Sequence, residues 1–114
     1  MARLRKRHLP HRIDLRLLDG EGARGPVRGD LIPNVPAYVE QKTRLKVDRR
    51  VGSKTFGEEI HSSTFVVLLL ENDVPPSTKV TVWKGTPRER TSEVIDSARF
   101  EYPRTPGHVE LYLE

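Results

Sequence analysis

Apolar positions in this chain come in short runs separated by breaks rich in glycine, proline and polar residues. The longest run, Phe65 to Leu70, has six apolar residues without alternation, and a second β-rich run follows at residues 80–83. Short length, β-branched and aromatic content and flanking turn residues predict a strand covered on both faces, although periodicity alone leaves a buried helix open. We predict that the two runs form a hairpin-like pair at the centre of the fold.

Alternation of apolar and polar residues predicts strands near both ends of the chain. Near the start, Ile13, Leu15 and Leu17 alternate with polar residues. The closing segment 108–114 places Val109, Leu111 and Leu113 on one face by the two-residue period of a strand. Opposite them, facing outward, are Glu110, Tyr112 and Glu114.

Two further segments are predicted strands of the same sheet. Residues 36–47 carry Tyr38 and a basic stripe on one face, and residues 91–102 alternate with exceptions at Ile95 and Asp96. A helix over 89–98 is the alternative for the second segment, because Thr91 and Ser92 could cap it. The sequence leaves helix and strand open there.

Together the pattern predicts an all-β fold, a small single-domain β-barrel or sandwich of about six strands. Closure would remove the exposed strand edges of such a sheet. We divide the chain into a basic N-terminal arm at residues 1–12 and a β-barrel domain at 13–114. The domain carries a long loop at about 48–58, which has two glycines and little pattern, and loops of that length are often functional.

Composition narrows the class of protein. The chain has 114 residues, 35% hydrophobic and 32% charged, which suits one domain with a thin core that completes its burial against other copies. Cysteine is absent, so disulfides and thiolate metal sites are impossible. No apolar stretch approaches the roughly 18 residues of a membrane span. We expect a protein of the cytoplasm, or of a particle assembled there, that does not associate with membranes.

Basic charge is concentrated in the arm. Residues 1–12 hold five of the twenty Lys and Arg residues and no acid, which leaves fifteen basic and sixteen acidic residues in the body. A general nucleic-acid-binding domain more often carries its basic excess on the folded body. The distribution therefore favours an arm that becomes ordered on an acidic neighbour or on nucleic acid.

Three groups of side chains are candidate contact sites. The arm residues, which we expect to contact a neighbour or DNA, are Arg3, Arg5, Lys6 and Arg7. The basic stripe, which could meet an acidic partner or a DNA channel, is Lys42, Arg44 and Lys46. The loop residues, candidates for a lumen-facing gate, are Arg49, Arg50, Lys54 and Phe56.

Catalytic and metal motifs are missing. No glycine-flanked serine elbow and no phosphate-binding loop is present. The histidines lack a spacing typical of zinc ligands, and the acidic pairs flank predicted strand ends. We therefore expect no enzyme activity, no bound metal and no cofactor.

Four stretches resemble the head-to-tail stopper, or head-closure, proteins of long-tailed bacteriophages. They are MARLRKRHLPH at the start, VEQKTRL at 39–45, VPPSTKVTV at 74–82, which we take as a hairpin, and TPGHVELY at 105–112.

The resemblance implies a structural virion protein located in the phage neck and assembled in the host cytoplasm. It implies a homo-oligomeric ring, six or twelve copies, below the portal and adaptor rings, closing the DNA-filled capsid. The tail terminator or tail tube would dock on its other side. A loop projecting into the channel would retain double-stranded DNA until ejection.

Two alternatives remain open. One is a small nucleic-acid-binding β-barrel that stacks bases on aromatics beside a basic groove, with Tyr38 on the strand face of Lys42 and Arg44. The other is an adaptor domain that binds one protein partner and forms no ring.

Overall fold

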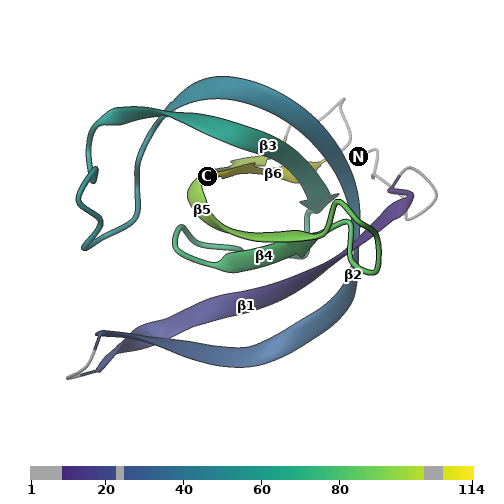
Figure 1. Ribbon diagram of the computed structural model, residues 1–114, viewed down its shortest axis with the longest axis horizontal. Coiled ribbons are helices and arrows are strands. Elements are labelled where there is room, and N and C mark those ends of the chain that lie inside the picture. Colours follow the sequence, from purple (N-terminus) through teal and green to yellow (C-terminus); the bar gives the residue numbers. More distant parts are fainter. Residues whose placement is uncertain (1–8, 23–24, 102–106) are drawn as a thin grey trace.

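The structure is a computed structural model that describes residues 9–22, 25–101 and 107–114. The described residues form no helix, and the predicted all-β fold is confirmed (Figure 1). All neighbouring strands are antiparallel and close into a barrel in the order β1-β2-β3-β6-β5-β4. The six strands are β1 His11–Gly22, β2 Gly25–Val47, β3 Glu59–Leu69, β4 Lys79–Val82, β5 Arg90–Phe100 and β6 His108–Leu113.

The predicted central hairpin of the two apolar runs is wrong. β3 pairs with β2 and β6, whereas β4 pairs with β1 and β5. The proline-rich connection between them is held against β5: Ser77 N donates to the Val94 carbonyl at 2.8 Å, and Val94 N donates to the Thr78 carbonyl at 2.9 Å. The connection therefore delivers β4 to the far side of the barrel instead of turning it back onto β3. The same pairing excludes a hairpin within residues 74–82.

Inward side chains of all six strands fill the barrel. Along β3, Val66 and Leu68 are fully buried while Phe65 and Val67 are half-buried, so only the inner face is completely covered. Each fully buried aliphatic side chain contributes roughly 1.5–3 kcal/mol. The core consists of Ile13, Leu15, Val35, Ala37, Val39, Val66, Leu68, Val74, Val80, Val82, Val94, Val109, Leu111 and Leu113.

The pairing of β5 explains why apolar and polar residues do not alternate regularly at Ile95 and Asp96. A register shift between Val94 and Asp96 lets both Val94 and Ile95 point into buried surroundings. Such a bulge places two residues of one strand opposite one of its partner. The helix alternative over 89–98 is wrong, because these residues are committed to ladders with β4 and β6.

The hairpin of β1 and β2 is longer than the barrel. β4 pairs with β1 only at Asp14 to Arg16, and β3 pairs with β2 only from Ala37 onward. The remainder of the hairpin projects from the body (Figure 1). Next to its base, Leu31 and Ile32 are 45% and 42% exposed.

The hairpin base is braced by a buried carboxylate. Asp14 accepts a hydrogen bond from Asn34 N at 3.1 Å and pairs with Lys84 Nζ at 2.8 Å. The Lys84 hydrogen bond, which outweighs the effect of burial, holds the pKa of Asp14 below its ordinary value. Asn34 has a φ of 56°, in the left-handed region that asparagine tolerates better than most residues. Asp14 therefore joins β1 to β2 and to Lys84 at the base of the hairpin.

Candidate functional site

The loop at residues 48–58, which connects β2 and β3, is closed at its base by backbone hydrogen bonds. Asp48 N donates to the Glu58 carbonyl and Gly57 N donates to the Asp48 carbonyl, both at 2.8 Å. Arg49 N donates to the Ile95 carbonyl of β5 at 2.7 Å. The ends of the loop are thus fixed to each other and to the barrel wall.

The Asp48 carboxylate organises the interior of this loop. Its side chain is fully buried, and it accepts hydrogen bonds from Arg50 Nε and Nη2, both at 3.0 Å. The Arg50 backbone N–H and Ser53 Oγ donate to it at 3.0 Å, and Thr55 Oγ1 donates as well. Burial alone would raise the pKa of Asp48, but these donors hold it far below its ordinary value.

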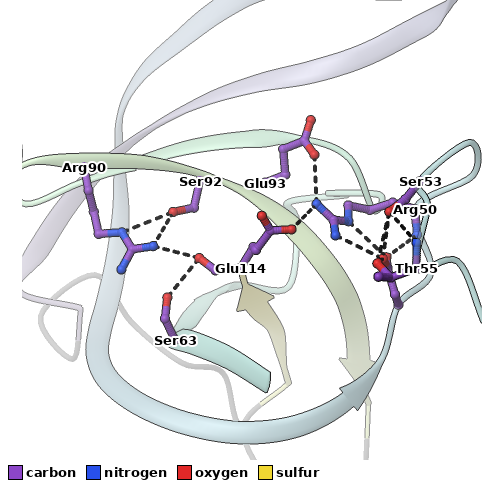
Figure 2. A network of polar contacts seen from close by, with 9 residues as sticks. Arg50, Ser53, Thr55, Ser63, Arg90, Ser92, Glu93 and Glu114 are labelled. Carbon is purple, nitrogen blue, oxygen red and sulfur yellow. Dashed lines mark hydrogen bonds and ion pairs between the residues drawn. The ribbon is translucent and has the colours of Figure 1, made fainter. Parts of the chain in front are cut away.

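Arg50 ties the loop to two strands that are distant in sequence. Its Nη1 lies 3.0 Å from Glu93 Oε1 on β5 and 2.5 Å from Glu114 Oε2, just after β6 (Figure 2). The Arg50 side chain is only 8% exposed. Its hydrogen bonds to Asp48 outweigh the effect of burial and raise the Arg50 pKa above its ordinary value. Arg50 therefore stays positively charged throughout the ordinary pH range.

These contacts correct one predicted site residue. Arg50 was expected among the residues facing a channel, but it is buried in ion pairs within the chain, so it cannot face a lumen. Arg49, Lys54 and Phe56 are exposed, with Phe56 at 54%. The structure adds Val51, which is 71% exposed beside them. We call Val51, Lys54 and Phe56 the loop tip.

Sequence reasoning missed the role of Asp48. The signal that could have found it is local, because Asp side chains commonly accept a hydrogen bond from the backbone two residues on. Asp48 does this with the Arg50 N–H. Val51 gives no such signal, since only the tertiary structure shows that its side chain lacks a covering neighbour.

Two residues of the basic stripe lie over aromatic rings of the same chain. Arg44 Cζ is 5.7 Å from the Phe65 ring centroid, and Lys46 Nζ is 4.1 Å from that of Tyr112. The two rings also contact each other, with centroids 5.5 Å apart. Lys42 is exposed and lies within a register shift between Gln41 and Arg44, where the two-residue alternation does not hold.

Tyr112 was expected to face outward, yet it is only 5% exposed. Its hydroxyl donates to Glu110 Oε1 at 2.6 Å. Burial, helped by this hydrogen bond, raises the pKa of Tyr112 well above its ordinary value. The outer face of β6 is therefore a packed surface of rings beneath long cationic side chains.

The candidate arm residues Arg3, Arg5, Lys6 and Arg7 lie outside the described residues. Immediately after them the chain is pinned to the barrel: Leu9 is buried, and its carbonyl accepts from Arg12 Nη1 at 2.9 Å. His11 Nδ1 accepts from Val39 N at 3.0 Å.

Metal-binding clusters and membrane-spanning helices are absent from the described residues. No group of three or more His, Cys, Asp and Glu in that part of the chain could hold a metal ion. None of its elements is a helix long and apolar enough to cross a membrane. An open polar depression of about 580 Å³ is lined by Lys79, Arg90, Thr91, Ser92, Glu93 and Glu114.

The two acidic residues that line this depression form ion pairs with the loop at 48–58. Glu93 and Glu114 both contact Arg50, and Arg90 donates to Ser92 Oγ and to the Glu114 carbonyl (Figure 2). The depression is thus an extension of the network that anchors residues 48–58.

No family model, curated protein or solved structure matches the chain.

The contacts of Asp48 predict that its contribution to the stability of the protein is lost at acidic pH. Because the folded-state pKa of Asp48 is lowered, its contribution to stability is complete above its ordinary pKa of 3.8 and declines as the pH falls below it. In denaturant titrations, the stability difference between the native chain and Asp48→Asn should shrink steadily below about pH 4. Asp73→Asn, at an exposed acid, should show a small difference throughout. A difference for Asp48→Asn that does not change with pH would contradict this assignment.

Proposed function

We propose that this chain is a structural subunit of the neck of a long-tailed phage, a head-to-tail stopper. In this proposal, six or twelve copies form a ring between the portal or adaptor ring and the tail. The ring closes the DNA-filled head, docks the tail and directs a loop of each subunit toward the DNA channel. The proposal starts from the four stretches of sequence that resemble these proteins.

One structural observation supports the proposal most: the loop at 48–58 has a fixed base and an exposed tip. A buried ion pair between Arg50 and Asp48 holds its base together, and Arg50 also pairs with the partly exposed Glu93 of β5 and with the exposed Glu114 after β6. Val51 and Phe56 are left without cover. Exposed apolar side chains grouped on a surface typically mark a contact with another molecule. A braced loop would keep its shape while neighbours or DNA press on it.

The charges at this loop suit a channel that must release DNA. The exposed bases Arg49 and Lys54 are accompanied by the exposed acids Glu58 and Glu59. Many unopposed phosphate contacts would bind DNA tightly and oppose its ejection. Because the exposed bases and acids at this loop are equal in number, they would not hold DNA tightly.

A nucleic-acid-binding barrel has less support. Arg44 and Lys46 lie over Phe65 and Tyr112, so these rings are covered by cations of the same chain. Base stacking needs open aromatic faces beside a basic groove. Tyr38, which is exposed, already has the His11 ring at 6.0 Å.

The test is addition of the purified chain to tailless, portal-containing capsids of the phage that encodes it. We expect a closed ring of the chain at the portal vertex, seen by electron microscopy, and its copy number counted by native mass spectrometry. DNA-filled capsids made by a phage that lacks the gene for this chain should lose their DNA, and adding the purified chain should prevent that loss. A one-to-one complex with a single partner, or no binding to the vertex, would overturn the proposal.

A further inference from the structure

The projecting hairpin leaves one strand edge open. Beyond Arg16, β1 is paired with β2 on one side, and β4 does not follow it on the other. Residues 17–22 therefore present backbone N–H and C=O groups without a ladder partner among the described strands. Such an edge is a template for an added strand. Six residues at 3.3 Å each give it a length of about 20 Å, that of an ordinary strand, and register shifts on both sides of Leu18 make the edge irregular at its start.

The other edge of the hairpin is unsuitable for strand addition. The part of β2 that lacks β3 as a neighbour contains Pro26, Pro33 and Pro36. Proline has no N–H, and in strands it occurs where the missing donor faces an open edge. Residues 17–22 contain no proline. An added strand is therefore directed to the β1 side.

The occupant can be sought within the chain itself. Residues 1–8 lie outside the described structure, and in sequence they hold four of the basic residues and no acid. Residues 17–22, LLDGEG, hold Asp19 and Glu21 and no base. Opposite charges on paired strands favour the pairing and steer the approach of the two segments.

The arm of the same molecule cannot reach this edge. Leu9 is buried near the start of β1, and Leu17 lies about 20 Å farther along the strand. Residues 1–8 span at most about 29 Å when fully extended. Reaching Leu17 would consume about six residues, which leaves too few to pair along 17–22. The arm must therefore come from another molecule.

We propose that residues 2–8 of a second copy add as a β-strand along residues 17–22 of β1. The donor segment and the acceptor edge are different parts of the molecule, so the contact is heterologous and repeats from copy to copy. Such a contact closes into a ring when the rotation between copies permits. The inference rests on the proposed function for its place in the neck, but it is tested on the purified chain alone, so each can fail separately.

The first test blocks the added strand without touching the barrel. Leu4→Pro/Arg5→Pro removes two adjacent N–H groups, so one of them faces the acceptor edge in either register. The matched control, Leu4→Ala/Arg5→Ala, removes the same side chains and keeps both donors. We expect sedimentation to show self-association at least about tenfold weaker for the proline pair than for the alanine pair. Equal self-association of the two variants, or a native chain that stays monomeric at every concentration, would overturn the inference.

The second test locates the contact. Since the chain has no cysteine, Arg5→Cys in one sample and Asp19→Cys in another can be mixed and joined with a short bismaleimide. We expect a heterodimer to dominate the products. Replacing the Asp19→Cys chain with Glu71→Cys, at an exposed site between β3 and β4, should reduce the yield at least about tenfold. Equal yields from the two acceptor positions would show random collision and overturn the inference.

Discussion

Replacing Arg50 with alanine is expected to lower the free energy of unfolding by about 3–5 kcal/mol, the usual cost of removing one partner of a buried ion pair. The variant leaves the Asp48 carboxylate, which is 0% exposed, without its bidentate partner. It also releases Glu93 and Glu114, and with them the ties from the loop to β5 and β6. Chemical denaturation followed by circular dichroism measures the loss.

Two control variants separate the ion pairs from general effects of the loop. Arg49→Ala removes a neighbouring exposed cation and should change stability by less than about 0.5 kcal/mol. Arg50→Lys keeps the charge but cannot form the paired contacts of a guanidinium, so its stability should lie between those of the native chain and Arg50→Ala. Should Arg50→Ala be as stable as Arg49→Ala, the network would not be what anchors the loop.

Placing charges on the loop tip is expected to weaken assembly about 100-fold or more while leaving the fold intact. In Val51→Asp/Phe56→Asp, both substituted side chains are exposed, so stability should change by less than about 1 kcal/mol. Two apolar contact residues at the centre of an interface are together worth a factor of about 100 or more in affinity. Binding to portal-containing capsids should fall by that factor, measured by co-sedimentation.

The matched control for the loop tip is Leu45→Asp. Leu45 is an exposed apolar residue of β2 outside the loop, with nearly the same exposure as Phe56. This variant should bind capsids with an affinity within about threefold of the native chain, a difference well under 1 kcal/mol. If Leu45→Asp lost as much affinity for capsids as Val51→Asp/Phe56→Asp, the loop tip would not be the docking surface. Normal binding by the double variant would remove the loop from the proposed function.

The local pattern of apolar and polar residues was sufficient to predict the class of fold and many of the core residues. Alternation identified the inward faces of the first and last strands, including Ile13 and Leu111, which are fully buried. It did so because the side-chain period of a strand is a property of neighbouring residues. Two glycines and the lack of a regular pattern also placed the 48–58 loop correctly between two strands.

Strand partners were decided only by the tertiary structure. The two apolar runs are adjacent in sequence, yet β3 and β4 lie apart in the barrel because the connection is bonded to Val94. Pairing depends on the register and closure of the whole sheet, for which a single strand carries no local signal. The bulge in β5 likewise emerged from the competing demands of two ladders.

In the candidate site, too, some features could be predicted from the sequence and others are shown only by the tertiary structure. Exposure of Arg49, Lys54 and Phe56 follows from their place in a polar loop, which the sequence alone indicated. The burial of Arg50 does not, because Glu93 of β5 and Glu114, just after β6, lie far away along the chain. A charge is held inside a protein only when it is paired, and two of the three acidic partners of Arg50 come from distant parts of the chain. The sequence alone indicated most of the strands and the loop at 48–58, and the closed barrel decided that residues 90–100 are a strand and which side chains meet.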